Sequence, residues 1–131
     1  MLVLKKKREP LKRIYDGEEF EINYIDETTA NRIYAEAETG KNRTVEDDNG
    51  NKIEIPDIDD DVFRKKMIVL ALHNADFAIE EEGKPKYLPC NDKTKIMFAT
   101  EFPNLANKII ADARNRKLWD NGTDIKKKSK S

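Results

Sequence analysis

The sequence has few of the residues that most often build catalytic, metal or disulfide sites. Its 131 residues include one cysteine, Cys90, and one histidine, His73. A single cysteine excludes an intramolecular disulfide and does not indicate a small secreted scaffold. The usual zinc ligand sets cannot be completed either. A nucleophilic pair of Cys90 with His73 is geometrically conceivable, but nothing in the surrounding sequence indicates an activated thiol.

Long apolar runs are also missing. The longest, Met67–Leu72, is far shorter than the roughly 18–20 residues of a membrane-spanning helix. The run Lys5-Lys6-Lys7 is not followed by an apolar stretch of about 7–15 residues, so no signal peptide is predicted. The few glycines form no phosphate-binding loop and no Gly-x-Ser-x-Gly motif. We expect a soluble cytoplasmic protein that has no cofactor or metal and is not an enzyme.

What the sequence does contain is charge. Charged residues make up 39% of the chain and hydrophobic residues 37%, which predicts one modest core and long solvated segments. Residues 1–15 and 83–131 are basic, with 6 and 12 bases against 1 and 5 acids, whereas residues 16–82 carry 20 acids and 7 bases. This segregation suits head-to-tail association or a partner with the complementary pattern, and it is equally compatible with a solvated surface that has basic ends.

Two β-hairpins are predicted from their turn dipeptides. Asp16-Gly17 lies between alternating apolar and polar residues and predicts an N-terminal hairpin over residues 11–25. Asn49-Gly50 predicts a second, polar hairpin over residues 41–56, which ends at Pro56. The second hairpin has so few apolar residues that we interpret it as an excursion from the core.

Four helices are predicted between and after these hairpins. Asp26 is a candidate N-cap for a short helix over Glu27–Thr39, and Gly40 is its expected stop. A second helix, Ile58–His73, is apolar around much of its girth and is the expected centre of the core. The acidic residues before it match the positive end of the helix dipole. They do not match a calcium-binding loop, because Val62 and Ile68 occupy the positions that require glycine and glutamate.

Two helices complete the predicted core. After an acidic turn at Glu80–Pro85, Asn91 or Asp92 caps a helix to about Thr100. Phe102-Pro103 opens the last helix, because proline is favoured at the first helical position. The expected fold class is α+β but mainly α: an N-terminal hairpin followed by a bundle of about four helices. Residues 1–118 are expected to form one domain with its helical core at 58–118, and residues 119–131 are expected to form a flexible basic tail.

The order of these elements over Val62–Lys117 resembles the tail assembly chaperones of long-tailed bacteriophages. The resemblance lies in the apolar helix, the turn Glu82-Gly83-Lys84-Pro85, the segment Phe102–Ile110 and the Lys-rich end. It implies a protein that self-associates in the host cytoplasm and coats the tape measure protein before the tail tube assembles around it. The tape measure protein, and with it the tail tube protein, are the implied partners, and the chaperone is expected to be absent from the mature virion.

The predicted contact surface is the apolar stripe of the last helix together with the residues that follow it: Leu105, Ile109, Ile110, Leu118 and Trp119. The stripe can equally pack on the Val62–Leu72 helix. Two other functions stay open. One is a small structural or connector subunit that remains in the phage particle. The other is a nucleic-acid-binding module that uses the basic ends and stacking by Tyr15, Tyr24 and Trp119, although a pI of 5.9 and the acidic middle disfavour it.

Overall fold

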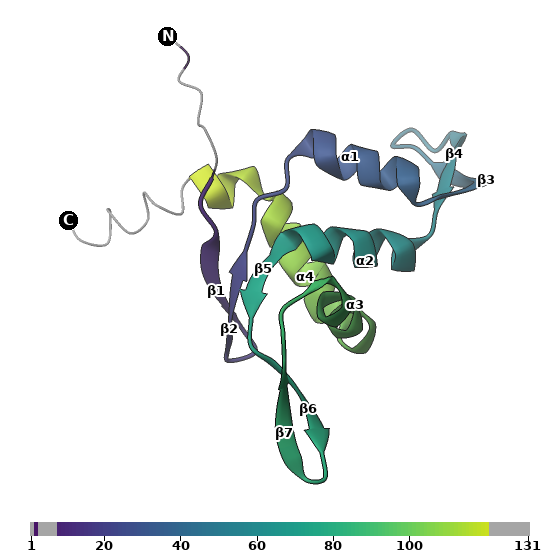
Figure 1. Cartoon of the computed structure of the whole chain (residues 1–131). Coiled ribbons are helices and arrows are strands. Elements are labelled where there is room, and N and C mark those ends of the chain that lie inside the picture. The colour runs from purple at the N-terminus through teal and green to yellow at the C-terminus, as the bar shows by residue number, and fades with distance from the viewer. Residues whose placement is uncertain (1, 3–7, 121–131) are drawn as a thin grey trace.

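The computed structural model of the chain describes residue 2 and residues 8–120. Of these residues 43% are helical and 35% are in strands, so the mainly helical fold class expected from the sequence is wrong. The fold is a mixed one, in which seven strands form three small antiparallel sheets around packed helices (Figure 1). The additional strands lie in segments that the sequence analysis assigned to a helix end and to a turn.

The N-terminal hairpin is confirmed and forms the larger sheet. Strands β1 (Leu11–Tyr15) and β2 (Glu18–Ile22) pair across Asp16-Gly17, whose φ angles of 51° and 80° are those that a tight hairpin turn requires. Strand β5 (Leu72–Ala75) pairs with the other edge of β2 and gives the order β1-β2-β5. Phe20 and Ile22 alternate with solvent-facing glutamates and place one face of this sheet in the core.

The central helix is shorter than predicted. Helix α2 (Asp60–Ala71) begins after the N-cap Asp59, and the chain enters β5 at Leu72 instead of continuing to His73. The physical reason is a long-range contact with the residue that follows β2: the Asn23 backbone N–H donates to the Ala71 carbonyl at 2.7 Å, and its side-chain amide donates to the Leu70 carbonyl at 3.2 Å. These bonds satisfy carbonyls that the end of a helix leaves unpaired.

Helix α1 (Glu27–Glu36) starts as predicted and ends early. Asp26 is its N-cap, and the carboxylate accepts from the Thr29 backbone N–H at 2.7 Å. The helix ends before the predicted Thr39, because β3 (Glu38–Glu46) begins at once and pairs with β4 (Lys52–Ile58). The second hairpin is thus confirmed but longer than residues 41–56. We call β3–β4 with its turn the arm; none of its residues belongs to the buried core cluster.

A third hairpin replaces the predicted acidic turn. Strands β6 (Phe77–Glu81) and β7 (Lys84–Leu88) pair across Glu82-Gly83, both with positive φ, and extend away from the body in Figure 1. Helices α3 (Asp92–Glu101) and α4 (Pro103–Arg114) follow as predicted, with Asn91 as the N-cap of α3. Residues 116–120 add a short helical turn after α4.

The core lies where β1-β2-β5 meets the helices. Its fully buried large side chains come from β2, α1, α2, β5 and α4, and they are Ile22, Ile33, Met67, Ile68, Leu72 and Ile109. Trp119 is also buried there, so residues 119 and 120 belong to the packed part of the chain. The remainder of the expected tail, 121–131, lies outside the described residues.

Candidate functional site

The five residues predicted to contact a partner lie in or against the core. Ile109 is 0% exposed, Ile110 and Trp119 are also buried, and Leu105 and Leu118 are half-buried against the same cluster. The Ile109–Ile110 pair packs in the cluster that contains Met67 and Ile68 of α2, as in the second interpretation left open by the sequence. These two isoleucines offer no surface that a partner can reach without repacking the protein.

Trp119 closes one end of the core. Its Nε1–H donates to the Asp112 carbonyl at 3.0 Å, and its ring meets the Tyr24 ring edge-on with centroids 5.7 Å apart. A buried indole needs such an acceptor, because an unpaired N–H away from water is costly. Trp119 therefore holds the end of α4 against the sheet. The Arg8 guanidinium lies over the Tyr24 ring, with Cζ 4.4 Å from the ring centroid, and it forms an ion pair with Asp120 at 2.9 Å.

An exposed apolar surface lies elsewhere, between β6–β7, the first hairpin and the junction of α3 with α4. Two adjoining hollows of about 370 and 100 Å³ share four lining residues, Phe77, Ala78, Phe98 and Phe102. We call the two hollows together the aromatic groove. Leu105 lines the larger hollow and is the one predicted contact residue that reaches this surface.

Phenylalanines form the floor of the aromatic groove. The Phe98 ring lies 5.7 Å from Phe20, 5.3 Å from Phe77 and 5.9 Å from Phe102, measured between centroids. Such spacings are those of mutually attractive aromatic pairs. The row runs from Phe20, which is buried, to Phe102, which is 58% exposed, so it connects the core directly with the surface. Met97 (41% exposed) and Ile79 (40% exposed) widen the apolar surface around Phe102.

The exposure of Phe102 follows from the local sequence. Pro103 disfavours helical geometry at the residue before it, and Phe102 accordingly has φ −126° and ψ 63°. Helix α3 ends there, with the Phe102 N–H donating to the Phe98 carbonyl at 2.8 Å, and α4 starts at Pro103. A large aromatic side chain is thus fixed at a corner between two helices, where neither helix buries it.

The rim of the aromatic groove is acidic. Four carboxylates line the larger hollow, Asp16, Glu18, Glu19 and Asp76, and Glu101 lines the smaller one. Within the described part of the chain, no lysine or arginine is among the lining residues of either hollow. An apolar floor with an acidic rim favours an apolar segment that carries lysine or arginine at its edges.

Tyr15 forms part of the wall of the larger hollow and is rigidly held. Its hydroxyl donates to Asp112 Oδ2 on α4 at 2.6 Å, and Arg13 Nη2 lies 3.8 Å from the same oxygen. Burial, together with the neighbouring Asp112 carboxylate, raises the pKa of Tyr15 well above its ordinary value of 10. The phenol therefore stays protonated, and this side of the groove is fixed by a bond between β1 and α4.

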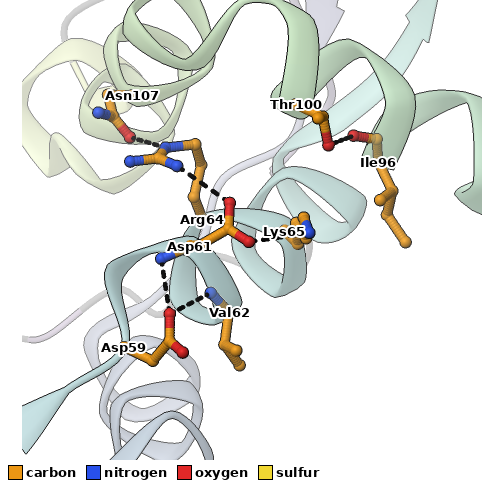
Figure 2. A network of polar contacts seen from close by, with 8 residues as sticks. All are labelled: Asp59, Asp61, Val62, Arg64, Lys65, Ile96, Thr100 and Asn107. Carbon is orange, nitrogen blue, oxygen red and sulfur yellow. Dashed lines mark hydrogen bonds and ion pairs between the residues drawn. The ribbon is translucent and has the colours of Figure 1, made fainter.

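The acidic residues at the start of α2 have a structural role (Figure 2). Asp59 Oδ1 accepts from the backbone N–H groups of Asp61 and Val62, at 3.1 and 3.2 Å. Asp61 pairs with Lys65 at 2.8 Å and with Arg64 at 3.4 Å, and this pairing, chiefly with Lys65, lowers the pKa of Asp61. Arg64 Nε in turn donates to Asn107 Oδ1 at 3.0 Å and links α2 to α4.

The described residues hold no cluster of three or more histidine, cysteine, aspartate or glutamate side chains suited to a metal ion. Cys90 is half-buried against the core, and His73 Nε2 lies 3.9 Å from Glu21 Oε2 on the neighbouring strand. Both residues thus have ordinary packing or ion-pair environments.

No protein-family model matches the chain, and no curated protein or solved structure shows significant similarity to it. The helices within residues 8–120 are all too short or too polar to cross a membrane.

Proposed function

We propose that the protein is a phage tail assembly chaperone whose aromatic groove binds apolar helical segments of the tape measure protein. The observation that carries this proposal is the row of phenylalanines that leads from the core to Phe102, flanked by the exposed Met97 and Ile79. In this role the protein acts in the host cytoplasm, associates with the tape measure protein and the tail tube protein during assembly, and leaves before the virion is complete.

The groove has the chemistry that such a ligand needs. An amphipathic helix presents apolar side chains every three or four residues and can insert them between Phe77, Phe98 and Phe102. Met97 gives the site an adaptable wall, because an unbranched thioether fits differently shaped neighbours. Such adaptability suits a chaperone that must cover many similar but non-identical stretches of one long protein.

The resemblance of Val62–Lys117 to tail assembly chaperones supports the identity of the partner. The apolar helix α2 and the segment Phe102–Ile110, which opens α4, carry this resemblance. The Glu82-Gly83-Lys84-Pro85 segment does not, because it lies at the tip of a hairpin and is not a connection between helices. The shape and lining of the groove support binding of an apolar helical segment, and co-expression tests whether that segment belongs to the tape measure protein.

The test is co-expression with the longest helix-rich protein encoded nearby, followed by affinity purification and determination of the molar mass of the complex. We expect the chain to keep that protein soluble in many copies per molecule. The double variant Met97→Ser/Phe102→Ser should lower the affinity by about 10- to 100-fold, because central apolar anchors dominate such interfaces.

The matched control is Ile14→Ser, which replaces an exposed isoleucine on β1 that is not among the lining residues of the groove. Circular dichroism should show that all variants keep the wild-type fold. Partner solubility that is unchanged in the double variant would exclude the groove as the binding site. Detection of the chain in purified virions would instead favour a structural or connector subunit.

A further inference from the structure

The two ends of the aromatic groove differ in charge. The end at the β1–β2 turn belongs to the larger hollow, whose lining includes four carboxylates: Asp16, Glu18, Glu19 and Asp76. The other end belongs to the smaller hollow, whose lining includes the apolar side chains of Ile79, Leu88 and Met97. The one acidic residue that lines the smaller hollow, Glu101, lies at the end of α3. We call the first the acidic end of the groove and the second the apolar end.

The strand register places Glu18 on the groove side of the sheet. Side chains alternate between the two faces of a strand, so Glu18 lies on the same face as Phe20, which forms part of the floor. It also lies opposite Tyr15, which forms part of the wall. Asp16 is in the turn beside it, and Asp76 follows the end of β5, the strand that pairs with β2. These three carboxylates therefore come together at one end of the groove.

The three carboxylates have no cation of their own. The side chains of Asp16, Glu18 and Asp76 are exposed, and none of them forms a hydrogen bond or an ion pair with another residue of the described chain. Glu19 differs, because its side chain alternates to the outer face of the sheet, where Lys12 lies 3.7 Å from it. Like charges that line one hollow repel each other, and a cation supplied by a ligand relieves this repulsion.

We propose that the aromatic groove binds a helical segment that is basic at one end only, and that the acidic end of the groove fixes the direction in which this segment lies. The apolar side chains of the segment contact Phe77, Phe98 and Phe102, and its lysine or arginine side chains lie over Glu18 and Asp76. Its other end is uncharged, because a charge among the apolar side chains there is costly. This inference rests on the proposed function and specifies the class of segment that the groove accepts.

The spacing of the rings fits a helix. The centroids of Phe20, Phe98 and Phe102 follow one another at 5.7 and 5.9 Å. The pitch of a helix is about 5.4 Å, so side chains one turn apart can reach successive rings. Glu18 lies two residues beyond Phe20 on the same face of β2, or about 7 Å along the strand. Cations one to two turns beyond the apolar side chains therefore lie over the acidic end.

The charges decide the direction more than the total affinity. An exposed ion pair changes an affinity only a few-fold, so the carboxylates of the acidic end together change it by roughly tenfold. Apolar anchors at the centre of the groove supply most of the remainder. A segment bound in the reverse direction keeps its apolar contacts but loses its ion pairs, so the two directions differ by about the same factor. Added salt reduces this factor, because exposed charges are screened over about 8–10 Å.

The test uses synthetic helical peptides of about 18 residues with blocked termini and leucine or phenylalanine at every third or fourth position. One peptide has lysines in its last turn, a second has them in its first turn, and a third has glutamine in their place. Fluorescence anisotropy of labelled peptides measures the affinity for the full chain at low and high salt. A nitroxide at either end of a peptide broadens the NMR signals of nearby backbone amides and so reports the direction of binding.

Both lysine peptides should bind roughly tenfold more tightly than the glutamine peptide at low salt. A nitroxide at the lysine end should broaden the amide signals of Gly17 and Glu18, at the acidic end of the groove. A nitroxide at the other end should broaden those of Leu88 and Met97, at the apolar end. The same result is expected for both lysine peptides, because the charge and not the chain direction decides how the helix lies.

Charge reversal in the groove gives the matching protein variant. Glu18→Lys/Asp76→Lys should abolish the preference for the lysine peptides and leave binding of the glutamine peptide within about twofold of wild type. The control is Glu46→Lys/Asp48→Lys, which changes the net charge equally at two exposed acids near the tip of the arm. Neither acid lines the aromatic groove, so the preference should stay roughly tenfold. Circular dichroism verifies that both variants are folded.

The outcomes separate this inference from the proposed function. Equal affinities for the lysine and glutamine peptides, or a nitroxide that broadens both ends of the groove alike, overturn the inference. The proposed function then still stands if Met97→Ser/Phe102→Ser weakens binding of every peptide. If this variant binds all peptides as tightly as the wild type, or if no peptide binds the wild type, the aromatic groove is not the binding site and both proposals fail.

Other occupants of the groove are detected in the same assay. A chain that ends at Asp120 lacks the four lysines of residues 121–131. If it binds the lysine peptides about tenfold more tightly than the full chain does, the groove is occupied by the end of its own chain, and a separate partner is excluded as its normal ligand. Oligomers that the lysine peptides dissociate would identify a second copy as the occupant and would likewise overturn the inference.

Discussion

At the scale of single residues, the decisive fact is that the strongest apolar residues of the last helix are buried. Ile109, on α4, is 0% exposed and packs in the core cluster. Ile109→Ala should therefore lower the free energy of unfolding by about 2–5 kcal/mol, since it removes buried methyl groups and leaves a cavity. Urea denaturation measures the change. The exposed neighbour on the same helix gives the control: Ala111→Ser should stay within about 0.5 kcal/mol of wild type.

Were Ile109 a contact residue that is exposed in the free protein, its replacement by alanine would change partner binding while stability stayed close to wild type. Phe102, unlike Ile109, has a large exposed ring, which lies at the corner between two helices. The sequence marked Phe102-Pro103 as a helix entry but not as a surface. An apolar stripe at helical spacing is the same for a core and for an interface, so spacing alone could not separate Ile109 from Phe102.

Tyr15 links the N-terminal hairpin to α4 through its hydroxyl. Tyr15→Phe should lower the free energy of unfolding by about 1–3 kcal/mol, because the substitution leaves the Asp112 carboxylate without its 2.6 Å donor. The effect also depends on pH. The folded-state pKa of Tyr15 is raised, so its contribution is complete below the unfolded pKa near 10 and is lost as the pH rises above it.

Between pH 9 and 11 the wild type should therefore lose stability more steeply than Tyr15→Phe. Chemical denaturation of both proteins at each pH tests the difference, and the variant itself controls for every other group that titrates in this range. Equal slopes would show that the Tyr15 phenol is not held protonated in the folded state.

At the scale of elements, several predictions that depend on a capping or turn residue are confirmed. Asp26 and Asn91 are N-caps, Asp16-Gly17 and Asn49-Gly50 are hairpin turns, and α4 opens at Pro103. Each of these depends on bonds within a few residues of chain. The predictions are wrong at Leu72, where the structure depends on pairing with the distant strand β2, and over residues 77–88, which form a local hairpin.

Leu72 continues an apolar run that reads as helix, but β2 supplies it with a strand partner at Ile22. The third hairpin has a local signal of its own. Phe77 and Ile79 alternate with Ala78 and Glu80, and Glu82-Gly83 lies between the two strands. Glutamate is less typical than asparagine or aspartate at a residue with positive φ, which weakens the turn signal. The strand content that made the mainly helical expectation wrong comes in part from these segments.

The N-cap of α1 permits a prediction at this scale. Asp26→Ala should cost about 1 kcal/mol of stability, because the Thr29 N–H loses its 2.7 Å acceptor. Hydrogen bonds from Thr29 lower the pKa of the Asp26 carboxyl. This contribution is therefore present above the unfolded pKa of about 4 and is lost as the pH falls through the lower folded value.

Thermal denaturation should accordingly show a difference between wild type and Asp26→Ala at pH 7 that shrinks towards pH 3. Asp48→Ala, at an exposed acid near the tip of the arm, should show no comparable difference at pH 7. A gap between wild type and Asp26→Ala that stayed constant with pH would mean that the charged carboxylate is not what caps the helix.

At the scale of the whole molecule, the chain combines a small core with two hairpins that extend from it (Figure 1). This arrangement explains how 39% charged residues coexist with a folded protein: the core needs only the apolar faces of β1-β2-β5 and of the helices. Large apolar side chains outside the core lie on the hairpins, on the outer faces of α2 and α3, and at the α3–α4 corner, where the aromatic groove is. The arm lies within the acidic segment that the sequence shows over residues 16–82.

The arm is therefore expected to be dispensable for folding. The backbone N–H of Asp59 donates to the Ala37 carbonyl at 2.9 Å, and Glu38 lies opposite Ile58, so the two ends of the arm meet. Replacing residues 39–57 by Asn-Gly should keep this closure, because the dipeptide forms a tight hairpin turn. The shortened protein should retain its near-ultraviolet circular dichroism and its cooperative unfolding, with a free energy of unfolding within about 1 kcal/mol of the full chain at low protein concentration.

Urea denaturation of both chains measures the difference in the free energy of unfolding, and near-ultraviolet circular dichroism compares the packing of their cores. A shortened chain that fails to fold would show that the arm is part of the folding unit, in which case its apolar residues Val45, Ile53 and Ile55 stabilise their own chain.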